Sequence, residues 1–197
     1  MLVGITGLAG SGKDALGAAL CSRTGALRLA FADPLKRAAM DLWGLKYEQC
    51  WGTEKEIVDP RWGLTPRVIL QRFGTEVVRS VHAETWTRRL LDDMAEARRG
   101  WVWGLESSTW QLRKGEAKRH FVVCDVRFVN EAAALRRQGG VIVRVERPGL
   151  VASDHASETE QAEIAVDTTV MNDGRLEDLG RKADELLRWM RAGEHAT

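Results

Sequence analysis

The sequence predicts an α/β fold built on a parallel five-stranded sheet with helices on both faces. Apolar, β-prone runs alternate with segments of helical periodicity along most of the 197 residues, and this alternation favours parallel strands joined by crossover helices. The run "FVVCDV" at residues 121–126 is almost wholly apolar, as expected of a central strand buried on both faces. A glycine-rich loop follows the first strand, at the end of the sheet where such folds bind ligands.

Each expected element is defined by its periodicity and by the residue that ends it. Short apolar, β-branched runs indicate strands, apolar residues spaced by three or four indicate helices, and glycine just after a helical segment indicates its end. In chain order we expect a strand at 2–6, a helix at 14–24 ended by Gly25, a strand at 27–32, a helix from Asp33-Pro34, a helix that stops at Gly74, a helix capped by Thr75 that reaches about Arg99, a hairpin or docked tryptophans at 100–120, a strand at 121–126, a helix at 130–138, strands at 140–147 and 165–172, and a helix at 176–191.

Two helix starts carry the same sequence signal, a capping side chain followed by proline. Asp33-Pro34 and Thr65-Pro66 both place an oxygen acceptor where it can bind free amide groups and a proline at the first helical position. The stretch between them at residues 46–65 contains two glycines, a proline and no clear period, so it is expected to be a long loop or an excursion.

The overall composition excludes several functional classes. With 29 Lys and Arg against 28 Asp and Glu, the net charge of +1 predicts neither a nucleic-acid nor a membrane surface as partner, and small charged substrates stay open. The three widely spaced cysteines argue against a disulfide framework and against a paired-cysteine zinc site. The start "MLVGIT" lacks a basic leader, and no apolar run approaches the roughly 20 residues that span a bilayer. We therefore expect a cytoplasmic protein; a homodimer is left open.

The segment "GLAGSGKDA" after the first strand matches the spacing of a phosphate loop (P-loop), Gly-x4-Gly-Lys. Its glycines let successive amides converge on phosphate oxygens, the following helix adds the positive end of its dipole, and the lysine bridges the outer phosphates. The alternative is a tight strand-to-helix turn with an exposed lysine. The candidate nucleotide-binding residues are Gly7, Leu8, Ala9, Gly10, Ser11, Gly12, Lys13, Asp14 and Ala15.

Two carboxylates are candidate magnesium ligands. Asp14 stands where the usual phosphate loop has Ser or Thr, and it either holds Mg²⁺, directly or through water, or stabilises the first helical turn by its charge. Asp125 ends the buried strand, the place where phosphate-loop enzymes keep a magnesium-orienting carboxylate, and a buried aspartate needs a partner. Arg127 follows two residues later. If the chain is still extended there, Arg127 shares the face of Asp125 and is close enough to clamp a phosphate.

Two clusters between the second strand and Asp125 point to a second anionic substrate. Each residue alone has an ordinary explanation as a helix cap or a surface side chain, but together "FADPLKRAA" and "TPRVILQRFGTEVVR" form a basic and polar set opposite the phosphate loop. The candidates are Asp33, Lys36, Arg67, Gln71, Gly74, Thr75, Glu76 and Arg79.

Trp86 and three further segments follow along the chain, namely "CDVRFVNEAAALRRQGGVIVRVERPG", "DHASETE" and "MNDG". With these and the segments quoted above, the sequence resembles the phage deoxynucleoside monophosphate kinases, a branch of the phosphate-loop nucleoside monophosphate (NMP) kinases. The resemblance is collinear from residue 4 to about residue 180. It implies one P-loop NMP-kinase-like domain over residues 1–197, with a helical NMP-binding excursion at about 33–100 and a lid at about 147–163. For a phage-encoded chain the compartment would be the host cytoplasm.

The resemblance implies magnesium-assisted transfer of the γ-phosphoryl group of ATP to a deoxynucleoside 5′-monophosphate (dNMP). It assigns Lys13 and the loop amides to ATP, Asp125 and Asp14 to Mg²⁺, and Arg127 to the transferred or acceptor phosphate. The two clusters would bind the monophosphate, with Gln71 and Glu76 as candidate readers of sugar or base; Arg144 and Arg147 would reach ATP from the base of the lid. The family usually has Thr after this aspartate, so Ala15 is a departure that puts the direct magnesium ligand in doubt.

Two alternatives stay open at this stage. A dephospho-coenzyme A kinase or a shikimate-type kinase would share the loop and Asp125 but not the pattern "LQ.FGTE..R". A nucleotide-binding factor without catalysis is the rival from another class, and the missing hydroxyl at Ala15 is the feature that favours it.

Overall fold

The computed structural model describes residues 1–104, 109–112, 117, 119–150 and 156–193. It confirms the predicted all-parallel, five-stranded sheet, whose order is β2-β5-β1-β6-β7. From β1 the chain passes to the edge strand β2, returns to β5 beside β1, and then continues on the other side of β1 through β6 to β7. The switch point therefore falls at β1, where doubly wound folds bind ligands. The strands are β1 (Leu2–Thr6), β2 (Leu27–Leu29), β5 (Phe121–Val123), β6 (Val141–Glu146) and β7 (Thr168–Met171).

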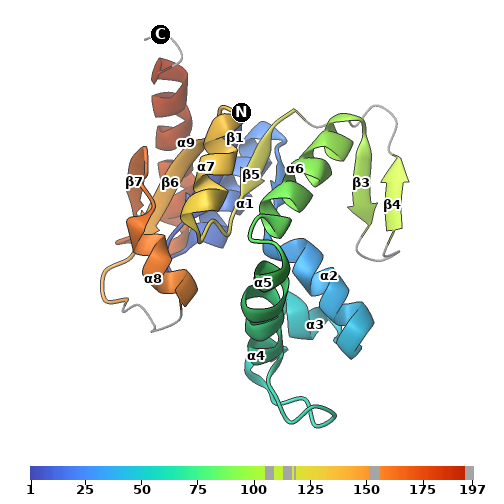
Figure 1. The fold of residues 1–197 in the computed structure, drawn as a ribbon. Coiled ribbons are helices and arrows are strands. Elements are labelled where there is room, and N and C mark those ends of the chain that lie inside the picture. Colours follow the sequence, from blue (N-terminus) through green and yellow to red (C-terminus); the bar gives the residue numbers. More distant parts are fainter. Residues whose placement is uncertain (105–108, 113–116, 118, 151–155, 194–197) are drawn as a thin grey trace.

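Helices cover both faces of this sheet (Figure 1). Successive residues of β1 point to opposite sides, so that Leu2 joins the core under α6 and α7 while Val3 and Ile5 join the core under α1 and α9. The helices are α1 (Lys13–Thr24), α6 (Thr85–Arg98), α7 (Val129–Arg137) and α9 (Leu176–Gly193).

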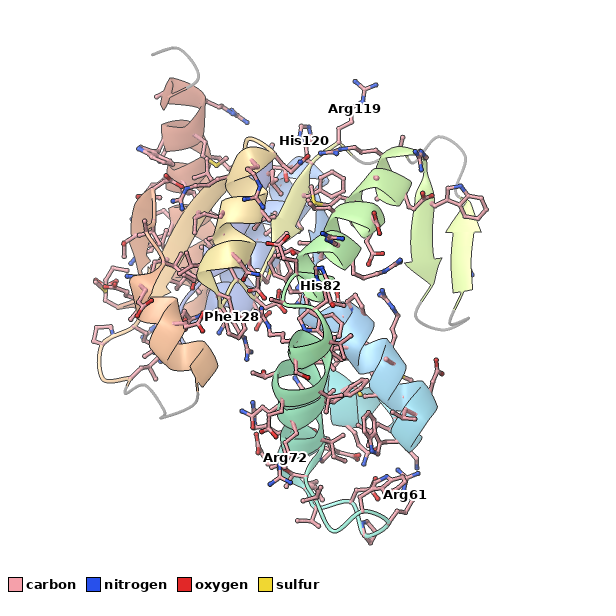
Figure 2. All side chains as sticks on the ribbon, in the orientation of Figure 1. Arg61, Arg72, His82, Arg119, His120 and Phe128 are labelled. Atoms are coloured by element: carbon pink, nitrogen blue, oxygen red, sulfur yellow. The ribbon has the colours of Figure 1, made fainter. Side chains whose placement is uncertain are left out.

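A helical excursion between β2 and α6 extends away from the sheet (Figure 1), with Arg61 at its far tip (Figure 2). It has a small core of its own, formed by Ala39, Leu45, Cys50 and Ile69. Part of the expected loop or excursion at 46–65 is ordered as two short helical turns. The elements are α2 (Ala32–Trp43), α3 (Tyr47–Cys50), the 3-10 turn η1 (Glu54–Glu56), α4 (Pro66–Gln71), the π-helix η2 (Arg72–Val78) and α5 (Arg79–Val81).

The expected cap at Thr65 is confirmed, whereas the expected cap at Asp33 is wrong. The Thr65 hydroxyl accepts a hydrogen bond from the amide of Val68 at 3.3 Å. Helix α2 already begins at Ala32, so Asp33 lies inside its first turn and makes no capping hydrogen bond. The carboxylate that caps α2 belongs to Asp125, from the neighbouring strand segment.

The expected helix end at Gly74 is also wrong. The helix continues through η2 and α5 to Val81, and Thr75 lies within it instead of capping a new one. A Cβ at Gly74 would lie 2.7 Å from Leu35 Cδ2, so glycine here permits close packing of α2 instead of a chain reversal.

Two smaller elements complete the described chain. Strands β3 (Trp101–Gly104) and β4 (Thr109–Leu112) pair antiparallel, which confirms the hairpin alternative for this part of the sequence. Helix α8 (Ala156–Glu163) lies within the predicted lid. Among the described helices, none combines the length and the apolar character needed to cross a bilayer.

Candidate active site

A cavity of about 640 Å³ lies where the excursion meets the carboxyl ends of β2 and β5. The phosphate loop forms one wall, and helices α2, α4 and η2 form another. Basic side chains outnumber acidic ones along it, which favours an anionic ligand. The charged lining residues are Lys13, Arg28, Lys36, Lys55, Arg67, Arg79 and Arg127 against Asp14, Asp125 and Glu131.

The phosphate loop leads directly into α1 without a side-chain cap. Gly12 precedes the helix at φ +98°, a conformation that favours glycine, and a Cβ there would lie 2.5 Å from Asn172 Nδ2. That amide donates to the carbonyl of Ser11 at 2.8 Å and holds the loop from behind. Lys13 Nζ donates to the carbonyl of Leu8 at 3.0 Å, folding over the loop. No side chain caps the first turn of α1, and uncapped helix starts of this kind commonly bind anions.

Two hydroxyls at opposite ends of this loop are buried without a hydrogen-bond partner in the described part of the chain. They belong to Thr6, the last residue of β1, and Ser11. Buried polar groups are normally satisfied, so their position beside the loop is typical of a site that a polar ligand completes.

Asp14 faces the cavity from the first turn of α1. Its Oδ1 accepts from Arg28 Nη2 at 2.9 Å, and its side chain is 72% exposed. Arg28 comes from β2 and was not among the sequence candidates. The next residue, Ala15, packs against the core cluster under α1 and α9.

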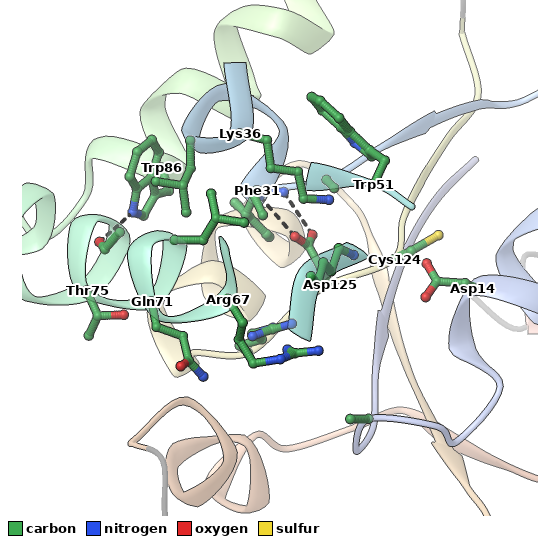
Figure 3. A pocket seen from close by; sticks show the side chains of 18 of the residues that line it. Asp14, Phe31, Lys36, Trp51, Arg67, Gln71, Thr75, Trp86, Cys124 and Asp125 are labelled. Atoms are coloured by element: carbon green, nitrogen blue, oxygen red, sulfur yellow. Dashed lines mark hydrogen bonds between the residues drawn. The ribbon is translucent and has the colours of Figure 1, made fainter. Parts of the chain in front are cut away.

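Asp125 has its structural partner in α2. Its Oδ1 accepts from the amide of Phe31 at 2.8 Å and its Oδ2 from the amide of Ala32 at 2.9 Å (Figure 3). Burial raises the pKa of this carboxyl, and nearby Asp33 raises it further. Each oxygen has a second lone pair, so capping α2 does not prevent Asp125 from accepting another hydrogen bond.

Glu131 on α7 connects the Asp125–Arg127 segment to the excursion. Its Oε2 accepts from the amides of Arg127 at 2.9 Å and Phe128 at 3.2 Å, while its Oε1 accepts from Arg79 Nη2 at 2.7 Å. The Arg79 guanidinium also lies 3.5 Å from the centre of the Phe128 ring, near the junction of sheet and excursion (Figure 2). Arg127 itself keeps an exposed side chain beside the cavity.

Burial raises the pKa of Glu131 to about 7, and this predicts a pH-dependent stability. The native protein then binds more protons than the unfolded chain between about pH 4.5 and 7, so stability falls as pH rises through that interval. From pH 5 to 8 we expect this group to lower the free energy of unfolding by about 2 kcal/mol. Urea unfolding of wild type and Glu131→Gln at pH 5, 6, 7 and 8 measures it. The variant should show the shallower decline; parallel declines would contradict the assignment.

The excursion brings most of the predicted acceptor residues to the cavity. Lys36, Arg67, Gln71, Gly74, Thr75 and Arg79 all line it, whereas Glu76 is exposed and Asp33 lies outside the lining. Asp33 instead accepts from Trp51 Nε1 at 3.0 Å. Figure 3 shows the charged ends of Asp14, Lys36 and Arg67 directed toward the space around Asp125.

Gly74 and Thr75 belong to a π-helix turn, a feature often found at functional sites. Trp86 Nε1 donates to the carbonyl of Gly74 at 3.1 Å and fixes the wide turn against α6. Gln71 directs its amide to the cavity from the preceding turn (Figure 3).

Lys55 is a further cation that sequence reasoning missed. It lies on η1, in the stretch expected to be a loop or excursion, and lines the cavity. Burial lowers its pKa, as do the neighbouring charges of Lys36 and Arg67. Arg67 pairs with Glu56, and the charge of Asp14 acts on Lys55 in the opposite direction. An anionic ligand would offset the remaining repulsion between the cations. A lysine in an irregular segment has no sequence signal of its own, because only the fold brings it to the site.

A second cavity of about 360 Å³ lies on the other side of the phosphate loop, lined by Gly7, Leu8 and Ser11. The predicted ATP residues Arg144 and Arg147 both line it. Arg147 is exposed, but the Arg144 guanidinium donates to three carbonyls at the end of α8, those of Gln161, Ala162 and Ile164. Arg144 therefore anchors α8.

Fold and site together define a class of protein, the P-loop kinases. Shikimate kinase from Aquifex aeolicus has a similar fold, with a TM-score of 0.53 at 13% identity over 98% of each chain. The profile of the deoxynucleotide monophosphate kinase family matches residues 45–183. A deoxynucleotide monophosphate kinase homologue of Acanthamoeba polyphaga mimivirus is 34% identical over 185 residues, which are 90% of this chain and 91% of the viral one. The chain belongs to the deoxynucleotide monophosphate kinase family.

Proposed function

We propose that this chain transfers the γ-phosphoryl group of ATP to a dNMP bound in the cavity between the phosphate loop and the excursion. Family membership supports the reaction and implies ATP as the donor. The assignment of the ATP and dNMP sites rests on one observation: Lys13, Arg127 and the cations of the excursion all line the same cavity. A phosphoryl transfer needs little covalent chemistry, so positioning and charge stabilisation supply most of the catalysis.

In this proposal the donor and acceptor occupy opposite walls of the cavity. The loop amides and the Lys13 ammonium hold the outer phosphates of ATP, and Arg147 reaches ATP from the second cavity. The excursion at about 33–100 binds the dNMP, with Lys36, Lys55 and Arg67 around its phosphate. Gln71 and Thr75 meet its sugar or base between Leu35 and Trp86. Arg127 lies between the two walls and stabilises the charge that develops on the transferred group.

The residues present fit a magnesium ion. Asp14 and Asp125 are hard oxygen donors on the same cavity, and among the described residues no group of three metal-binding side chains forms. Mg²⁺ at kinase sites typically uses one or two carboxylates, with phosphates and water as its other ligands. When bound it neutralises phosphate charge; the chain contributes the two carboxylates that orient it.

Asp14→Asn is expected to raise the Mg²⁺ concentration for half-maximal activity by about threefold or more, because a neutral amide is a poorer magnesium ligand. Initial rates across a magnesium titration measure it, with Asp41→Asn, an exposed acid outside the cavity, as the control. If the magnesium dependence of the rate is unchanged, Asp14 is not a magnesium ligand, and its contact is the ion pair with Arg28.

The function itself is tested with a panel of acceptors. ATP and Mg²⁺ are mixed with each of the common dNMPs, with dephospho-coenzyme A and with shikimate, and both products are quantified. We expect a deoxynucleoside diphosphate and ADP in equal amounts. Transfer only to a non-nucleotide acceptor would overturn the proposal, and absence of ADP with every acceptor would favour a nucleotide-binding factor.

A further inference from the structure

Gln161 on the last turn of α8 lies between the two halves of the site. Its side chain is buried, with only 5% of the residue exposed. The Nε2 amide donates to the carbonyl of Gly7 at 3.1 Å and to the carbonyl of Val126 at 3.2 Å. Both N–H groups of the amide are therefore used. Gly7 opens the phosphate loop, and Val126 lies between Asp125 and Arg127.

Both partners of Gln161 are restrained from their other sides as well. Gly7 has φ +142°, and a Cβ on it would lie 2.4 Å from the carbonyl oxygen of Val145 on β6. The amide of Val126 donates to the carbonyl of Ile5 at 3.1 Å. The start of the loop thus packs closely on β6, the Asp125–Arg127 segment is hydrogen-bonded to β1, and the Gln161 amide donates to one carbonyl of each.

The backbone of Gln161 is also fixed. Arg144 on β6 donates to the carbonyl of Gln161 at 3.1 Å and to that of Ile164 at 2.8 Å. A cation at the carboxyl end of a helix is stabilised by the helix dipole. The end of α8 is thus held on β6, so it cannot shift without moving the side chain that contacts both loops.

We propose that Gln161 is a positioning residue that fixes the separation between the phosphate loop and the segment carrying Asp125 and Arg127. This inference rests on the proposed function, because it is in-line transfer that requires these groups at a set distance. A misplacement of about 1 Å can lower a rate by roughly 10²-fold. The Gln161 side chain supplies two N–H donors without a charge, whereas an ionised glutamate of the same length supplies none.

Two variants test the role. Gln161→Glu keeps the size and shape but presents oxygens to both carbonyls, and Gln161→Ala removes the contact. Glu160→Ala, an exposed neighbour on the same helix, is the matched control. We expect kcat at 25 °C to fall at least tenfold in both variants, with less than threefold change in KM for ATP or dNMP, and no change in the control. A lower melting temperature with unchanged kcat, or full activity of Gln161→Glu, would overturn the proposal.

Hydrogen exchange gives a readout that does not depend on the acceptor. In Gln161→Ala we expect faster deuterium uptake in peptides that cover residues 4–13 and 122–128 than in wild type or Glu160→Ala. If the wild-type protein phosphorylates no dNMP, the proposed function fails, and this measurement still decides the role of Gln161. Unchanged uptake in both peptides would overturn it.

Discussion

Lys13→Ala is expected to lower kcat/KM for phosphoryl transfer by about 10³-fold or more. The ammonium is the positive charge of the loop wall at the cavity, and charge stabilisation is the main source of catalysis in this chemistry. A 10³-fold loss corresponds to about 4 kcal/mol of transition-state stabilisation. Steady-state rates over a range of ATP concentrations measure it, together with binding of a non-hydrolysable ATP analogue by calorimetry.

The control for this variant is Arg23→Ala, which removes a cation from the same helix. Arg23 pairs with Asp184 on α9 and lies outside the cavity. An exposed ion pair contributes little to stability, so this variant should retain wild-type rates. Near-normal turnover of Lys13→Ala would show that the loop does not hold the donor phosphates.

Arg127→Ala is expected to lower kcat by about 10³-fold or more, as removal of an arginine that stabilises a transferring phosphoryl group does. Its melting temperature should change by less than about 2 °C, because the side chain is exposed and Glu131 holds only its backbone amide. Rates and thermal unfolding are measured on the same preparation. Arg137→Ala, an exposed arginine on α7 outside the cavity, is the control.

A different balance of the two effects would reassign Arg127. A large drop in melting temperature with a matching loss of rate would mark it as a structural residue. A normal rate would place the catalytic charge elsewhere on the cavity, with Arg28 and Lys55 as the next cations to replace.

The sheet and the phosphate loop could be predicted because their signals are local. A run such as residues 121–126 is apolar at nearly every position, which few environments other than a doubly covered strand allow. The loop is likewise encoded by the spacing of Gly7, Gly12 and Lys13. Arg67 and Gln71, four residues apart on α4, share one helix face, which their spacing predicts. Lys36 on α2 lines the same cavity.

The rest depends on contacts between segments far apart in the chain. Asp33 has the sequence of a helix cap, but Asp125 takes that place from 92 residues later along the chain. Gly74 has the sequence of a helix stop, yet its role is set by Leu35. Glu131 and Gln161 are polar residues in ordinary helical patterns, and only the fold brings their side chains to backbone groups of the site.

The most direct test is a structure of the complex with Mg²⁺, a non-hydrolysable ATP analogue and a dNMP. We expect the triphosphate on the loop amides and Lys13, and the monophosphate across the cavity beside Arg67 and Lys36, with Arg127 between the two. A monophosphate bound outside this cavity, or a triphosphate that does not contact the loop, would contradict the account.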